Sequence, residues 1–414
     1  MTAHLAVEAA ASKLPNGWAI EPFRRLAAER GTRNSQLLER SLSLSSTGLL
    51  YDRTDETDRQ FASEQSARNA WVVLPGDLVV NPMWLFGGAI GISDRRGAVS
   101  PDYRVYSMSA RLEPRFVHHL LRSSPYRDQY RLYMRAETTF DRRITKDDFS
   151  EMPVVVPPRL AQRAIAAFLD GETARIDRLI ELRRRILGHV ASRRRLATDR
   201  MLADSSGGAA WPVVKLKYVV RGFVDTLHAT APEEDDGPGY IVGTACIKGR
   251  SLNLDVARRC STETLREWTK RAVPQPGDVL LTREAPAGEA ALVPAGLALA
   301  PGQRVVLVQT DPDRMLPELV LHSIYSARAG RFFDLLGRET TVAHLNMADI
   351  GALPVVLPPF DAQVQVAAKI GAELDSLDHA SATMSRQIEL LLERRQALIT
   401  AAVTGQLEIP GVAA

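Results

Sequence analysis

The sequence Met152-Pro153-Val154-Val155-Val156-Pro157-Pro158, followed by Ala161-Gln162 and a long charged segment, decides the fold, because the chain contains this arrangement twice. The second copy begins Leu353-Pro354-Val355-Val356-Leu357-Pro358-Pro359 and continues through Ala362-Gln363. The copies are 201 positions apart, since 359 − 158 = 201 and 363 − 162 = 201. Two copies are too few for a repeat array, so the spacing predicts a duplicated protein with two pseudo-equivalent halves.

Each copy predicts a short strand, a stop and a long helix. The β-branched run Val154–Val156 favours a buried strand, and the two prolines that follow it end the strand. The helical segment of the second copy carries an apolar stripe whose spacing alternates four and three, as in a coiled-coil seam. The stripe of the first copy is weaker, because Thr173, Arg183 and Arg194 interrupt it. The predicted seam residues are Ile176, Ile180, Leu187, Val190, Leu377, Met384, Ile388, Leu391 and Leu398.

Packing the two stripes against each other would form a long antiparallel two-helix coiled coil. The alternative is an ordinary helical hairpin inside one large domain, although sustained heptads and helices of this length favour the coiled coil.

The duplication also reaches the globular parts of the chain. Pro75-Gly76-Asp77 precedes the apolar run Leu78–Val80, and Pro276-Gly277-Asp278 precedes Val279–Leu281, again at an offset of 277 − 76 = 201. We therefore predict an α+β protein with two pseudo-symmetric globular domains separated by the coiled coil. The predicted regions are a first domain (1–158), a first helix (159–204), a linker (205–210), a second domain (211–359), a second helix (360–404) and a tail (405–414).

Length and composition exclude several classes of protein. A chain of 414 residues is too long for one core, and a net charge of +3 means that any strongly basic surface must be local. Cys246 and Cys260 alone can build neither a disulfide framework nor a four-cysteine zinc site. No apolar run is long enough for a membrane span, and the N-terminal segment, with Glu8 and no basic region, does not resemble a signal peptide. We expect a cytoplasmic protein that does not bind membranes.

Arginine and lysine concentrate in residues 95–146. This segment contains twelve basic and five acidic residues, with aromatic residues interleaved. This pattern is typical of a nucleic-acid surface, because arginine forks suit phosphates and guanine edges. A solvated helix face is the alternative. The residues that we predict to contact DNA are Arg95, Arg96, Tyr103, Arg104, Arg142, Arg143 and Lys146 in the first domain, and Lys248, Arg250, Arg283, Arg304, His344 and Asn346 in the second.

An enzyme would need machinery that the sequence does not contain. Asn81-Pro82-Met83-Trp84 resembles the Asn-Pro-Pro-aromatic loop of adenine-amino methyltransferases, but its third residue is Met and no Gly-rich nucleotide loop accompanies it. The chain also lacks the P-loop, the HExxH zinc motif and the G-x-S-x-G elbow. We predict neither a catalytic nor a metal site. The alternatives are a self-contained N6-adenine DNA methyltransferase and a coiled-coil scaffold that does not contact DNA.

The duplicated Pro-Pro motifs, together with the later run Glu393–Gly405, resemble the specificity (S) subunit of Type I restriction–modification systems, the HsdS family. The resemblance spans nearly the whole chain. It implies a non-catalytic DNA reader whose two target-recognition domains each read one half of a bipartite, asymmetric target, with the helices fixing their separation.

The same resemblance implies the partners. They are double-stranded DNA, two methyltransferase (M) subunits and the restriction/motor (R) subunits. S-adenosylmethionine would bind to the M subunits, and this chain would hold no cofactor.

Overall fold

The computed structural model describes residues 14–53, 64–133, 143–203, 210–227, 229–284, 286–337, 345–410 and 412. The chain forms two compact units. Unit 1 comprises Met1–Leu182 and Arg386–Ala414, and unit 2 comprises Arg183–Ser385. The predicted scheme set each long helix apart as a region of its own, whereas each helix divides between the two units. The expected α+β class is confirmed.

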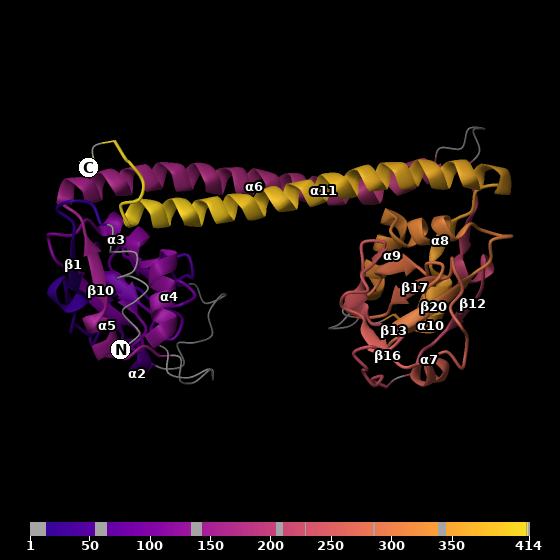
Figure 1. Ribbon diagram of the computed structural model, residues 1–414, viewed down its shortest axis with the longest axis horizontal. Coiled ribbons are helices and arrows are strands. Elements are labelled where there is room, and N and C mark those ends of the chain that lie inside the picture. The colour runs from indigo at the N-terminus through magenta and orange to yellow at the C-terminus, as the bar shows by residue number, and fades with distance from the viewer. Residues whose placement is uncertain are drawn as a thin grey trace. The chain divides into compact units, whose positions relative to one another are not determined.

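Unit 1 is built around the antiparallel sheet β2-β9-β6-β7, with three two-stranded sheets beside it, β1-β10, β3-β4 and β5-β8. Figure 1 labels β1 and β10 of the first of these pairs. Its strands are β1 (Ala19–Pro22), β2 (Ala27–Glu29), β3 (Leu42–Leu44), β4 (Leu50–Asp52), β5 (Trp71–Val73), β6 (Leu78–Val80), β7 (Ile90–Ile92), β8 (Gly97–Val99), β9 (Arg104–Met108) and β10 (Pro153–Val156). Its helices are η1 (Phe23–Arg25), α2 (Glu64–Arg68), α3 (Pro114–Leu121), α4 (Ser124–Tyr133), α5 (Lys146–Glu151), the first part of α6 (Arg159–Ala203) and the last part of α11 (Phe360–Val403).

Unit 2 repeats this plan with the sheet β12-β20-β17-β18 and the pair β11-β21, and adds the sheets β16-β13-β19 and β14-β15. Its strands are β11 (Val213–Lys215), β12 (Val220–Val224), β13 (Gly239–Val242), β14 (Ile247–Lys248), β15 (Ser251–Leu252), β16 (Arg258–Cys260), β17 (Val279–Thr282), β18 (Ala290–Leu292), β19 (Leu299–Pro301), β20 (Val305–Thr310) and β21 (Pro354–Val356). Its own helices are η2 (Leu216–Tyr218), η3 (Thr244–Cys246), α7 (Thr262–Trp268), α8 (Pro317–Ile324), α9 (Ala327–Gly337) and α10 (Met347–Ala352).

The repeated Pro-Gly-Asp sequence forms the same turn before β6 and before β17. Gly76 and Gly277 both have φ near +90°, a conformation that glycine adopts without strain. The Asp77 carboxylate accepts a hydrogen bond from the N–H of Leu74 at 2.8 Å. Asp278 accepts one from Gln275 at 2.9 Å. The turn needs glycine and aspartate at these positions, which explains why both copies of the sequence carry them.

Each globular part shares one hydrophobic core with the long helices. In unit 1, Phe116 of α3 belongs to the same buried cluster as Leu169 of α6 and Ile399 of α11. In unit 2, Leu319 of α8 belongs to a cluster with Ile370 of α11. Because neither helix could bury its apolar face alone, the helices and the globular part of each unit stabilise one another.

The predicted strands at the Pro-Pro motifs are confirmed as β10 and β21, and each pairs antiparallel with the first strand of its unit. Helices α6 and α11 begin at the residues predicted and end within one residue of the prediction. In the described part of the chain, no helix combines the length and the apolar character that crossing a membrane requires.

Candidate nucleic-acid interface

A buried glutamine fastens the first turn of α6 to the globular part of unit 1. The Gln162 side-chain nitrogen donates hydrogen bonds to the carbonyls of Pro157 at 2.8 Å and Arg111 at 3.1 Å. Its oxygen accepts one from the N–H of Glu113 at 2.7 Å, just before α3. Both donors of the amide and one acceptor are therefore used in a fully buried position.

Gln363 makes the same three contacts in unit 2. Its nitrogen donates to the carbonyls of Pro358 at 3.2 Å and Arg314 at 3.0 Å, and its oxygen accepts from the N–H of Leu316 at 2.8 Å. The glutamine of the duplicated motif thus ties the start of each long helix to the loop before α3 or α8. The sequence showed the repeat of this glutamine but not its partners.

The seam positions follow the buried side of the helices. Ile176, Ile180 and Leu377 are buried. The remaining predicted seam residues are half-buried, and they are Leu187, Val190, Met384, Ile388, Leu391 and Leu398. Within each unit the two helix segments therefore meet along the stripe that the heptad spacing marks.

An ion pair joins the two helices in each unit. Asp177 of α6 contacts Arg395 of α11 at 2.9 Å in unit 1, and Arg194 of α6 contacts Asp378 of α11 at 3.3 Å in unit 2. The two aspartates and the two arginines are each 201 positions apart. Arg194, which interrupts the predicted apolar seam, therefore has a charged partner on the facing helix.

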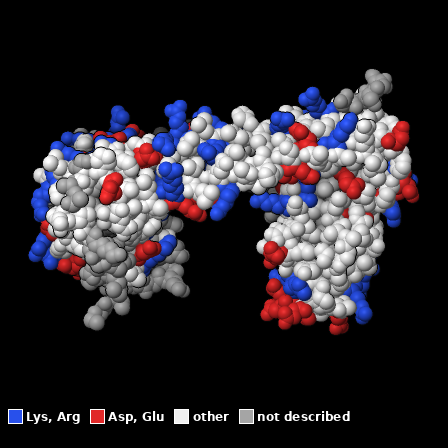
Figure 2. Space-filling model, turned by 45° about the horizontal axis from the view of Figure 1, so that its top comes forward, with Lys and Arg blue, Asp and Glu red and all other residues white. Residues whose placement is uncertain are grey.

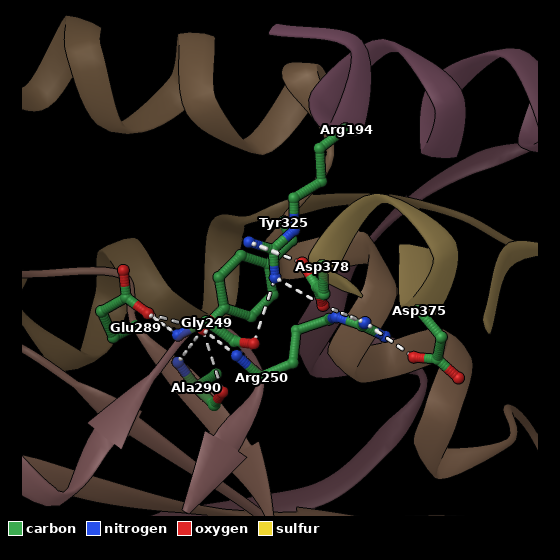
Figure 3. Close-up of polar contacts among 8 residues, drawn as sticks. All are labelled: Arg194, Gly249, Arg250, Glu289, Ala290, Tyr325, Asp375 and Asp378. Carbon is green, nitrogen blue, oxygen red and sulfur yellow. Dashed lines mark hydrogen bonds and ion pairs between the residues drawn. The ribbon is translucent and has the colours of Figure 1, made fainter. Parts of the chain in front are cut away.

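A turn of the globular part adds further contacts to this ion pair in unit 2 (Figure 3). Arg250, in the turn between β14 and β15, reaches Asp378 at 2.6 Å and Asp375 at 3.0 Å. Arg194 donates to the carbonyl of Gly249 in the same turn, at 3.1 Å. Although Arg250 was predicted to contact DNA, its side chain is only 10% exposed and is engaged with α11.

Tyr325, which follows α8, holds this turn against β18 (Figure 3). Its hydroxyl accepts hydrogen bonds from the N–H groups of Arg250 at 3.0 Å and Ala290 at 2.8 Å, and it can donate to the Glu289 carboxylate at 2.8 Å. Glu289 also accepts from the N–H of Gly249 at 2.6 Å. Burial raises the pKa of Tyr325, so the hydroxyl stays protonated and available as a donor.

Arg122, which follows α3, occupies the position in unit 1 that Tyr325 occupies in unit 2. Helices α3 and α8 begin 317 − 114 = 203 positions apart, and so do these two residues. The Arg122 guanidinium donates to the carbonyls of Gly88, Ile90 at 3.3 Å and Ser46 at 3.1 Å. Burial lowers its pKa to about 10. Arg122 therefore joins the β3–β4 hairpin to the loop between β6 and β7.

Three basic residues predicted to contact DNA in unit 1 make contacts within the domain. Arg95 pairs with Asp94 at 2.8 Å, and Arg96 pairs with Glu39 at 2.6 Å. Arg104 donates to two backbone carbonyls just before α5, at 2.8 and 3.2 Å. Arg95 and Arg96 keep much of their side chains exposed, whereas Arg104 connects β9 to the segment before α5.

The other predicted residues of unit 1 lie nearer to open surface. Arg143 and Lys146 have side chains that are 54% and 60% exposed, and the Lys146 ammonium contacts Glu29. Tyr103 lines a pocket beside the β3–β4 hairpin. Arg142 of unit 1, and His344 of unit 2, lie outside the described residues.

In unit 2, two of the predicted DNA-contacting residues serve the fold. Arg283 is buried, and its guanidinium donates to the carbonyl of Leu345 at 2.8 Å and to the Asp225 carboxylate at 3.0 Å. Asn346 caps α10 in a reciprocal capping box. Lys248 is exposed. The sequence predicted the polar character of these positions but not their partners.

Charge does not single out one basic patch on the face that Figure 2 shows. On the face drawn in Figure 2, lysine and arginine are scattered over both units among acidic residues. Arg304 of unit 2, for example, pairs with Glu284 at 3.2 Å. In the described ranges, no group of three or more His, Cys, Asp and Glu side chains is placed to hold a metal ion.

The loop Asn81–Trp84, which resembles a methyltransferase motif in sequence, follows β6. The Asn81 side-chain oxygen accepts a hydrogen bond from the N–H of Met83 at 3.1 Å, so the turn of the loop itself uses this oxygen. Asn81, Met83 and Trp84 line the same pocket as Tyr103.

No protein-family model and no curated protein matches the chain, but solved structures do. A chain from a type I R-M system, solved to show the basis of complex assembly and conformational transition, is 19% identical with a TM-score of 0.66, covering 95% of this chain and 100% of that chain. The HsdS subunit from Thermoanaerobacter tengcongensis is 20% identical with a TM-score of 0.48, covering 95% and 98%. The S subunit of the Type-I restriction-modification system from M. genitalium is 13% identical with a TM-score of 0.42, covering 94% and 97%. The chain therefore has the fold of a chain of the type I restriction–modification system, over nearly its whole length.

Proposed function

We propose that this chain is the DNA-binding specificity subunit of a Type I restriction–modification complex. The globular part of each unit reads one half of a bipartite, asymmetric DNA target. One observation carries this proposal, namely that the two units share their sheet order, glutamine contacts and helix ion pairs but differ in the loops around them. Two related binding domains with different loops suit two different half-sites.

In this proposal catalysis belongs to partner subunits. Two M subunits, carrying S-adenosylmethionine, methylate adenine N6, and R subunits join the complex for restriction. The chain supplies target recognition from the cytoplasm and holds no cofactor of its own. The likeness in fold to a chain whose structure concerns assembly of a type I R-M complex supports this assignment. Helices α6 and α11 set the spacing between the half-sites.

Methylome sequencing of a strain with and without this chain tests the proposal. We expect one bipartite motif with methylated adenine to disappear when the chain is deleted and to return when it is restored. The purified chain alone should transfer no methyl group from S-adenosylmethionine to DNA. An unchanged methylome would contradict the specificity role, and methyl transfer by the chain alone would favour the self-contained methyltransferase.

A further inference from the structure

A pocket of about 640 Å³ opens on unit 1 between the β3–β4 hairpin and the loop that follows β6. Trp84 is 55% exposed and Tyr51 is 45% exposed, and both line this pocket. In the described part of unit 1, these are the large aromatic side chains that reach such exposure. Their gathering in one concave site indicates a planar ligand, because an aromatic face gains most from another flat apolar surface.

The walls of this pocket are fixed before any ligand binds. Arg122 bridges the carbonyl of Ser46 on the hairpin and that of Gly88 on the β6–β7 loop. The hairpin and β7 also approach so closely that a Cβ at Gly91 would overlap the carbonyl of Gly48. A pocket that keeps its shape without ligand loses little conformational entropy on binding.

The side chains around the pocket suit a nucleotide. Trp84 stacks on Phe86 with ring centroids 6.2 Å apart and an interplanar angle of 24°, so Phe86 holds the indole while more than half of Trp84 stays exposed. Because the Asn81 oxygen is bonded to the N–H of Met83, its amide nitrogen is the group left to donate to a base edge. Serine hydroxyls of the hairpin complete a polar lining.

A cation stands at the edge of the same pocket. The Arg143 guanidinium lies 3.5 Å from the Met83 sulfur and 3.7 Å from the Asp102 carboxylate, and both of these residues line the pocket. More than half of the Arg143 side chain is exposed. It could therefore bind a phosphate next to a base that occupies the pocket.

We propose that this pocket accepts one unstacked nucleobase of the bound DNA, stacked on Trp84, with Arg143 on the adjoining phosphate. The inference rests on the proposed function, since it assumes that unit 1 reads DNA. The concave position of Trp84 favours this arrangement over a side chain wedged between stacked base pairs. Removing a base from the stack has a cost in free energy, which the stacking and phosphate contacts offset.

Unit 2 differs at the matching place. The residue 201 positions after Pro82 is Arg283. It is buried and bonded to Asp225 and to the backbone of Leu345. The side chain of Arg283 is therefore buried inside unit 2. The corresponding loop of unit 1 instead exposes Trp84. We therefore expect a base held by such a pocket in the half-site of unit 1 alone.

The experiment uses the full chain in complex with its M subunits and duplexes that contain the target found by methylome sequencing. One at a time, the partner of each base in both half-sites is replaced by an abasic site. The base opposite then has no pairing to break before it can leave the stack. The M subunits must also extrude the adenine that they methylate in each half-site, so affinity can rise at those two positions. We expect one further position, in the half-site of unit 1, at which affinity rises about tenfold or more. Trp84→Ala should bind the intact duplex roughly 5- to 100-fold more weakly, whereas Trp84→Phe should retain most of the affinity.

Tyr218→Ala provides the matched control, because Tyr218 is an exposed aromatic residue of unit 2, 57% exposed, away from this pocket. It should leave affinity unchanged. The pocket assignment fails if no position other than the methylated adenines gains affinity, or if Trp84→Ala binds like the parent while the parent still binds its target. Quenching of Trp84 fluorescence by free deoxynucleosides, with an abasic scan that is flat apart from the methylated adenines, would assign the pocket to a free nucleoside and overturn the inference. If the parent complex binds no specific DNA, the proposed function fails as well.

Discussion

Unit 1 and unit 2 share a framework but connect their variable loops to it differently. In unit 2, Arg250 and Tyr325 bind the β14–β15 turn to α11 and to β18. In unit 1, Arg122 takes the place of Tyr325 and binds the β3–β4 hairpin to the β6–β7 loop. The side chain after α3 or α8 thus determines which loop is fixed to the framework, while the glutamine contact and the central sheet stay the same.

This difference shows where the two halves of a duplicated protein can diverge. The shared contacts lie at the junction of helix and globular part, where buried polar groups need their partners. The differing contacts lie in loops, where a new side chain can bind a different carbonyl without disturbing the sheet. This division lets the loops diverge while the framework stays constant.

The largest expected effect comes from removing the shared glutamine. Gln162→Leu should leave two carbonyls and the N–H of Glu113 without partners, and Gln363→Leu should do the same in unit 2. Each change should lower the free energy of unfolding by about 3 kcal/mol, measured by urea denaturation. Gln65→Leu, at an exposed position, is the control. Effects of clearly different size in the two units would show that the frameworks are not equivalent.

The helix contacts of the two units should differ in strength. Arg250→Ala removes a nearly buried guanidinium from two carboxylates and should destabilise unit 2 by about 2 kcal/mol. Arg395→Ala breaks the more exposed pair with Asp177 and should cost below about 1 kcal/mol. Limited proteolysis with fragment mapping can assign each loss to its unit. Equal losses would contradict the comparison.

Two buried histidines should make the stability of both units depend on pH. His119 and His322 are 203 positions apart and buried, and burial lowers the pKa of each to about 4. An unfolded histidine binds its proton near pH 6.5, so stability is retained above that pH and falls as the pH drops from 6.5 toward 4. The loss at pH 5 is about 2 kcal/mol for each histidine. Denaturation at pH 7.5 and pH 5 should show this loss in the parent chain, and His322→Gln should reduce it by about that amount.

The neighbours of these histidines distinguish the two units further. The His119 ring nitrogen lies 2.6 Å from the Asp170 carboxylate. Gly371 stands 201 positions after Asp170, and the charges that act on His322 are those of Arg250 and Asp375. Asp170→Gly would give unit 1 the arrangement of unit 2. If His322→Gln leaves the pH dependence unchanged, burial does not hold this histidine neutral.

The sequence predicted the elements that depend on local pattern. The prolines and the β-branched runs located β10 and β21, and the heptads located α6 and α11 with nearly correct ends. Contacts between distant residues could not be predicted in this way. From the sequence, Arg283 was predicted to contact DNA. Its actual partners, Asp225 and Leu345, lie 58 and 62 positions away. The pocket of unit 1 likewise brings together Tyr51 of strand β4 and Trp84 of the loop that follows β6.

The ion pairs between the helices were partly visible in the sequence. Both aspartates and both arginines lie on the 201-residue register. Their pairing requires two antiparallel helices in contact, which the register alone does not specify.

The central claim is that each unit reads its own half-site from a shared framework. Its most direct test replaces the globular part of unit 2 with that of unit 1. In this hybrid, residues 18–158 stand in place of residues 211–359, and the parent helices are kept. Methylome sequencing of a strain carrying the hybrid and the M subunits should show a target in which the half-site of unit 1 occurs twice, in inverted orientation. If the hybrid still directs methylation of the parent asymmetric target, the claim that each unit reads its own half-site is contradicted.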